Sequence, residues 1–147
     1  LLDAFGRDHP DELLLRWLRG SKWNVEQAIE KLSRTFRWRQ AERISHLLAQ
    51  GDRAINRKEL LKGKCYLFGE DRHGRPLTFI HLVEHLHGEF SVAETTRLAI
   101  LLIETTRLLM KRPHQCGTIV LDLKHFQRKN FDFQLVKVFL DFLENHY

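Results

Sequence analysis

Hydrophobic residues follow two different spacings along the chain. Before residue 63 they recur at three- to four-residue intervals, a pattern that predicts amphipathic helices. After it, short apolar runs bounded by turn residues predict strands. The predicted strands cover residues 64–68, 76–82 and 117–123, and helical spacing returns at 91–111 and from 132 onward. The pattern therefore predicts a helical segment followed by strand, strand, helix, strand and helix.

The first two helices have clear start and stop signals. Pro10, followed by acidic residues, favours a helix start, and Gly20 favours a helix end. Residues 24–27, Asn-Val-Glu-Gln, form a capping-box pattern that starts the second helix, with Trp23 in the staple position before it. The predicted inward positions are Leu14, Trp17 and Leu18 on the first helix and Val25, Ala28, Ile29, Leu32 and Phe36 on the second.

The second half predicts a mixed sheet. Asp71 to Gly74 has turn chemistry, so the first two strands form a hairpin. A capping box at Ser91–Glu94 starts a long helix that ends before Pro113. A strand–helix–strand unit predicts that the last two strands are parallel. On the final helix the predicted inward residues are Phe133, Val136, Phe139, Leu140 and Leu143.

Three segments resemble one known family in the order expected for it. Residues 16–25, RWLRGSKWNV, are similar to the "RFLRARKFDV" signature that opens CRAL-TRIO lipid-binding proteins. Residues 69–76, GEDRHGRP, resemble the family's "G-x-D-K-x-G-R-P" hairpin, and residues 117–123, GTIVLDL, resemble its central strand. The chain ends in ENHY, which looks like the approach to the family's "NYPE". Within this family, the chain resembles the branch of yeast-type phosphatidylinositol transfer proteins.

The resemblance implies an α/β fold. An N-terminal helical lobe is expected at residues 1–62, followed at 63–147 by the first half of a mixed βαβ lipid-binding lobe. Because the family's module continues past this point, the C-terminal half of that lobe is expected to be absent. Its uncovered strand edge and apolar helix faces would favour association, so residues 1–147 alone are expected to self-associate or to pack loosely.

The resemblance also implies site residues. In the phosphatidylinositol branch the lysine of the signature contacts the headgroup phosphate, and it corresponds to Lys22. The arginine beside it is replaced by Ser21. Apolar lining of the lipid pocket is expected from Leu67, Thr78, Ile80, Ile119 and Leu121. The positions that bind choline headgroups in related proteins correspond to Leu67, Thr78, Gly117 and Ile119. Since only one of these carries a polar group, phosphatidylcholine is not the expected ligand.

The net charge of +5 is concentrated in the helical segment. Residues 1–62 carry thirteen basic and nine acidic residues, a net +4, whereas the remainder carries eleven and ten, a net +1. Lys31, Arg34 and Arg37 are therefore candidates for contact with an anionic membrane surface. A solvated helix face is the alternative interpretation of such a run.

Other candidate sites are weaker. His81, His85 and His87 with Glu84 suggest a metal site, but the expected ligand spacing is missing. Asp122 ends a strand with no identifiable base or nucleophile beside it. Cys65 and Cys116 fit reduced core residues of an intracellular protein better than a disulfide. No catalytic residue, metal or cofactor is predicted.

The sequence thus predicts a non-enzymatic module that binds and transfers a lipid, with phosphatidylinositol and not phosphatidylcholine as the expected ligand. It is expected to be cytoplasmic and peripherally associated with membranes. The alternatives are a protein-interaction or regulatory module that kept the fold without exchanging lipid, and nucleic-acid binding through the Arg-rich second helix. No aromatic residues alternate with basic ones on a sheet face, which argues against nucleic acid.

Overall fold

The chain forms two compact units, which are described separately. The computed structural model describes residues 10–111 and 113–147. The helical unit contains the described residues up to His46 together with Leu140–Tyr147, and the sheet unit contains Leu47–Phe139. These units do not coincide with the predicted lobes 1–62 and 63–147, and the first nine residues of the former lie outside the described residues.

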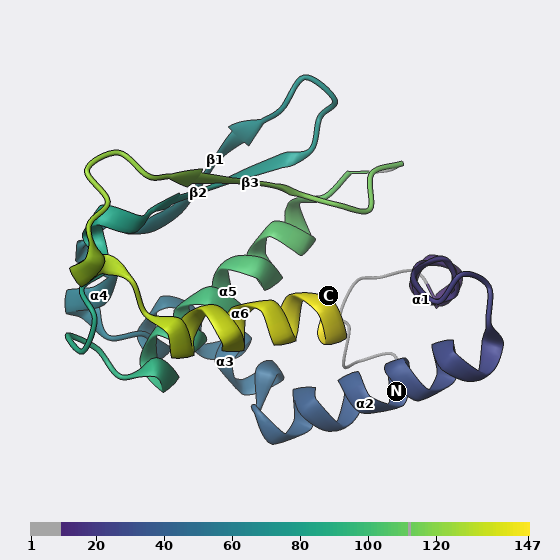
Figure 1. Cartoon of the computed structure of the whole chain (residues 1–147). Coiled ribbons are helices and arrows are strands. Elements are labelled where there is room, and N and C mark those ends of the chain that lie inside the picture. Colours follow the sequence, from purple (N-terminus) through teal and green to yellow (C-terminus); the bar gives the residue numbers. More distant parts are fainter. Residues whose placement is uncertain (1–9, 112) are drawn as a thin grey trace. The chain divides into compact units, whose positions relative to one another are not determined.

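The helical unit is built on a hairpin of α1 (Pro10–Gly20) and α2 (Val25–Ala41) (Figure 1). As predicted, α1 starts at Pro10. The Asn24 side chain caps α2 by accepting a 2.9 Å hydrogen bond from the Gln27 backbone N–H. α3 (Ile44–Gln50) follows and crosses from this unit into the sheet unit.

The core of the hairpin lies along one side of α2. Its buried members are Leu13, Trp17 and Ala28, with Leu18, Leu32 and Phe36 packed against them. The prediction was wrong for Leu14, Val25 and Ile29, which are exposed, and for Trp23, which is 62% exposed instead of packing as a staple. Because α1 lies against the Ala28 side of α2, Leu32 and Phe36 also pack there, whereas Val25 and Ile29 at the start of the stripe stay exposed.

The C-terminal end of α6 (Phe133–His146) completes the helical unit. The Thr35 hydroxyl on α2 donates a 3.0 Å hydrogen bond to the Asn145 carbonyl. The ring of His146 stacks on Trp38 with centroids 4.2 Å apart. Phe142 is buried, and Phe139 and Leu143 are half-buried, whereas Phe133, Val136 and Leu140 are exposed and not inward as predicted.

The sheet unit contains the predicted mixed sheet, so the α/β class is confirmed. Its strands are β1 (Cys65–Glu70), β2 (Pro76–His81) and β3 (Thr118–Asp122), in that spatial order. β1 and β2 are antiparallel, and β2 and β3 are parallel as the βαβ pattern predicts. The connecting helix α5 (Val92–Leu109) begins at the predicted capping box, in which Ser91 and Glu94 bond reciprocally.

Shorter elements join these parts of the sheet unit. They are η2 (Gly51–Ala54), α4 (Arg57–Leu61), η3 (Leu82–Glu84) and η4 (Arg128–Asn130). α5 runs along one face of β1 and β2 (Figure 1), where Leu98 and Ile100 are buried. In the described part of the chain, no helix is both long enough and apolar enough to span a bilayer.

Candidate functional site

The turn between α1 and α2 presents Lys22. The Trp23 N–H donates to the Leu18 carbonyl at 2.8 Å, and the Lys22 N–H donates to the Arg19 carbonyl at 3.0 Å. This pair of bonds is the Schellman arrangement that closes a helix C-terminus. Lys22 occupies the position after the cap, with φ of 52°, and Trp23 follows with φ of 66°. α1 thus ends at Gly20 as predicted, and the residues with a left-handed backbone are Lys22 and Trp23, which follow it.

A left-handed backbone is unfavourable for both of these residues. A side chain in this conformation costs about 1–2 kcal/mol per residue, which is why glycine usually fills the position that Lys22 occupies. The turn nevertheless holds this conformation, because its consecutive backbone N–H groups are all bonded, including Ser21 to Trp17 and Asn24 to Ser21, both at 3.0 Å. Backbone strain of this kind is a reason to look for a function of the side chain.

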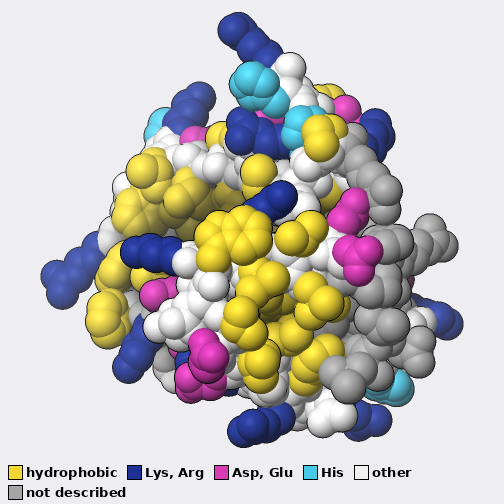
Figure 2. Space-filling view, turned by 90° about the vertical axis from the view of Figure 1, so that its right-hand side faces the viewer, with side chains coloured by type: hydrophobic (Ala, Val, Ile, Leu, Met, Phe, Trp, Pro, Cys, Tyr) yellow, Lys and Arg dark blue, Asp and Glu magenta, His cyan; other side chains and the backbone are white. Residues whose placement is uncertain are grey.

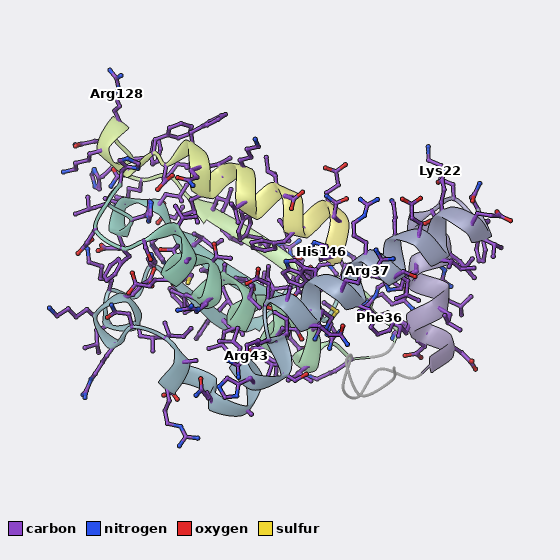
Figure 3. The ribbon with its side chains drawn as sticks, turned by 90° about the horizontal axis from the view of Figure 1, so that it is seen from below. Lys22, Phe36, Arg37, Arg43, Arg128 and His146 are labelled. Atoms are coloured by element: carbon purple, nitrogen blue, oxygen red, sulfur yellow. The ribbon has the colours of Figure 1, made fainter. Side chains whose placement is uncertain are left out.

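The Lys22 side chain is exposed. Figure 3 shows it at the end of the helical hairpin, pointing away from both helices. Its neighbour Ser21 is only 3% exposed, and among the described residues the Ser21 hydroxyl has no hydrogen-bond partner. Ser21 therefore does not replace the family's second basic side chain at the surface, and Lys22 alone supplies a cation at this position of the signature.

The three basic residues predicted on α2 differ in their surroundings. Arg37 is exposed in the C-terminal half of α2 (Figure 3), and Lys31 is half-buried. Arg34 forms an exposed ion pair with Glu30 at 3.1 Å, so part of its charge is already matched. Arg39, from the same run, is buried.

The five predicted lining residues share one face of the sheet. Leu67, Thr78 and Ile119 are register partners across the three strands, and Ile80 pairs with Leu121 on the same face. This is the face that α5 covers, since the Thr78 and Thr106 hydroxyls lie 3.1 Å apart. α5 contacts β1 and β2, and on β3 the side chains of Ile119 and Leu121 remain 40% and 54% exposed. The sheet face thus offers an exposed apolar edge.

Gly117, just before β3, has no space for a side chain. A Cβ atom there would lie 2.7 Å from the Thr106 methyl group on α5. The hydroxyl that choline-binding relatives are expected to carry at this position would clash with α5, and the Ile119 side chain has no polar group.

On the opposite face of the sheet, sequence reasoning missed a row of three polar side chains, joined by one ion-pair contact and one hydrogen bond. The Asp122 carboxylate lies 3.3 Å from Nδ1 of His81, and Nε2 of His81 lies 3.0 Å from the Tyr66 hydroxyl. Each strand supplies one member. The sequence could have indicated this contact, because His81 and Asp122 end neighbouring parallel strands and therefore lie at the same edge of the sheet. Asp122 therefore has a base beside it, contrary to expectation.

The three histidines considered for a metal site do not share one partner. His81 faces Asp122, whereas His87 Nδ1 lies 3.2 Å and His85 Nε2 3.8 Å from the Asp132 carboxylate. Burial lowers the pKa of His85, and the nearby Lys64 cation lowers it further. Within residues 10–111 and 113–147, no group of three or more His, Cys, Asp and Glu side chains is placed to hold a metal ion.

Comparison with known families identifies this arrangement. The CRAL/TRIO domain matches residues 60–147, which is more than half of the chain, and the CRAL/TRIO N-terminal domain matches residues 2–34. This chain belongs to the CRAL/TRIO family. The N-terminal match contains the Lys22 turn, and the larger match contains the whole sheet and all five lining residues.

Individual relatives are similar in sequence over nearly the whole chain. A CRAL-TRIO domain-containing protein of Schizosaccharomyces pombe is 37% identical over 99% of this chain. Phosphatidylinositol transfer protein CSR1 of Eremothecium gossypii is 32% identical over 95%, and phosphatidylinositol transfer protein PDR17 of Saccharomyces cerevisiae is 24% identical over 92%. The chain covers 34%, 34% and 41% of these three proteins, so it spans about a third to two fifths of their length.

Proposed function

We propose that this CRAL/TRIO chain belongs to a non-enzymatic phosphatidylinositol transfer protein that acts at the cytoplasmic surface of membranes. The helical unit would contact the anionic headgroup and the membrane, and the sheet unit would shield part of the acyl chains. The names of two relatives, from Eremothecium gossypii and Saccharomyces cerevisiae, support this choice of lipid.

The observation that carries the proposal is the backbone of Lys22. If this position served only to end α1, glycine would serve better, because it adopts φ of 52° without strain. The lysine keeps its exposed ammonium group at the cost of that strain. An ammonium group is a good point-charge partner for a phosphate. A phosphate-binding role for the side chain explains why lysine is present.

The exposed apolar edge of β3 supports the second half of the proposal. Ile119 and Leu121 can contact acyl chains without displacing any packed helix, because α5 lies against the other two strands. A choline headgroup would find no hydroxyl and no aromatic ring at positions 117 and 119, because Gly117 has no space for a side chain and Ile119 is apolar. Phosphatidylinositol is therefore favoured over phosphatidylcholine.

The test compares Lys22→Gly with Lys22→Arg in the full protein chain. Transfer of labelled phosphatidylinositol between vesicles is expected to fall about tenfold or more in Lys22→Gly, as expected for the loss of a hydrogen bond to a charged group. Lys22→Arg should retain most of the transfer. Labelled phosphatidylcholine should not be transferred by any of the three proteins.

Stability distinguishes this role from a structural one. Relief of the left-handed strain, about 1–2 kcal/mol, is offset by the greater chain entropy of glycine, about 0.4–1 kcal/mol, so Lys22→Gly should unfold at an equal or higher urea concentration. Unchanged phosphatidylinositol transfer in Lys22→Gly would remove Lys22 from the headgroup site. An absence of lipid transfer in the unmodified protein would favour a protein-interaction module instead.

A further inference from the structure

The helical unit exposes large apolar side chains beside the Lys22 turn. Trp23, Val25 and Ile29 are 62%, 52% and 60% exposed. Val25 and Ile29 are four residues apart on α2 and therefore lie on the same side of the helix. Figure 2 views the side on which α1 and the start of α2 lie in Figure 1, and hydrophobic side chains gather at the surface there with Lys and Arg among them. Lys22, Trp23, Val25 and Ile29 are called the turn surface below.

The backbone of the turn surface is held by hydrogen bonds, although its side chains are exposed. Trp23 is the second residue of the Schellman turn, and its N–H is bonded to the Leu18 carbonyl at 2.8 Å. The Asn24 side chain caps the next helix directly after it. Because the backbone of Trp23 is already fixed, docking of its indole ring on a partner costs little backbone entropy.

The charges around the turn surface select an anionic partner. Residues 16–25 contain the three cations Arg16, Arg19 and Lys22, and the nearest acidic residues along the chain are Glu12 on α1 and Glu26 in the first turn of α2. On the part of α2 that follows, Glu30 pairs with Arg34 and reduces the net positive charge. The combination of an exposed indole, two aliphatic side chains and flanking cations is typical of segments that enter the headgroup region of anionic bilayers.

We propose that the turn surface is the membrane-insertion site of this protein, with Trp23 as the anchor in the interfacial region of an anionic phospholipid bilayer. The proposal rests on the proposed lipid-transfer function and gives it a docking surface different from the basic side of α2. An indole favours this depth because its ring is apolar and its N–H can bond to headgroups or water. Insertion of Trp23 would also bring the adjacent Lys22 to the level of the lipid phosphates.

Tryptophan fluorescence of the full protein chain reports directly on this surface. The three tryptophans are Trp17, which is 9% exposed, Trp38, which is stacked on His146, and Trp23. Vesicles of phosphatidylcholine with phosphatidylserine should shift the emission to shorter wavelength, and phospholipids brominated on the acyl chains should quench it. Trp23→Phe should abolish most of the quenching, and vesicles of phosphatidylcholine alone should have a much smaller effect.

Co-sedimentation with the same vesicles measures affinity. Trp23→Ser should weaken binding about tenfold or more, as expected when one large apolar side chain is lost from the bilayer. The matched control is Leu61→Ser, because Leu61 is 76% exposed but lies on α4 in the sheet unit. This control should bind like the unmodified protein, and circular dichroism should show that both variants are folded.

Two results would overturn the inference. One is equal vesicle binding by Trp23→Ser and the unmodified protein. The other is protection of Trp23 from the aqueous quencher acrylamide without vesicles, because another part of the protein would then cover it. The lipid that co-purifies with each variant is measured separately by mass spectrometry. Loss of vesicle binding with bound phosphatidylinositol retained would support the inference, whereas absence of bound lipid in the unmodified protein would count against the proposed function alone.

Discussion

Removing the charge of Glu59 should destabilise the sheet unit strongly. Glu59 is 0% and Lys64 is 5% exposed, and their side chains form an ion pair. The Thr95 hydroxyl donates a 2.7 Å hydrogen bond to Glu59 Oε1 and lies 3.3 Å from the Lys64 ammonium. Glu59→Gln keeps an acceptor for Thr95 but leaves the Lys64 cation buried without a counterion. We expect the free energy of unfolding to fall by about 3–5 kcal/mol.

Replacing both members of the Glu59–Lys64 pair should lower the free energy of unfolding much less than removing the charge of one member. Glu59 Oε2 has no hydrogen-bond partner among the described residues, so the cost of desolvating the carboxylate is only partly recovered. The double variant Glu59→Leu/Lys64→Met replaces both charges by apolar groups. It should lie within about 1–2 kcal/mol of the unmodified protein, although two single charge removals would sum to about 6–10 kcal/mol.

Urea unfolding followed by far-ultraviolet circular dichroism measures these differences. Lys62→Gln is the control, since the Lys62–Glu89 pair is in the same unit but partly exposed, and it should change stability by less than about 1 kcal/mol. If the double variant were as unstable as Glu59→Gln, the cost would not come from an unpaired buried charge. The reasoning would then be wrong.

The remaining predictions concern titratable groups. Burial lowers the pKa of His146, so below its ordinary value of 6.5 the unfolded chain binds the proton more readily and stability falls as the pH drops toward the lower folded pKa. His146→Phe keeps a ring on Trp38, and it should reduce the fall in urea midpoint between about pH 7 and about pH 5; the remaining fall is assigned to His85, whose pKa is also lowered. An unchanged pH dependence in this variant would contradict the assignment to His146. Burial also raises the pKa of Cys65 to about 11, whereas Cys116 is exposed, so mass spectrometry should find Cys65 alkylated at least about tenfold more slowly in the folded protein. Equal rates would show that Cys65 is accessible.

Features that depend on neighbouring residues were predictable from sequence. The Asn24 and Ser91 caps form at the predicted positions because a cap satisfies backbone groups within three residues of itself. The parallel pairing of β2 and β3 follows from the helix between them, since a direct turn cannot join parallel strands. The helix stop at Gly20 and the cap at Asn24 also predict that Lys22 lies in a turn, although they do not predict its left-handed backbone.

Features that depend on distant partners were decided only by the tertiary structure. The periodicity of α2 identified its apolar residues, but the position of α1 determined that Ala28 is buried and that Val25 and Ile29 are exposed. The contact between His81 and Asp122 joins residues about forty positions apart through strand register. A sequence pattern specifies which side chains favour burial or pairing, because that preference belongs to each residue. It does not specify which partner covers them, because the partner is chosen by packing between elements that are far apart in the chain.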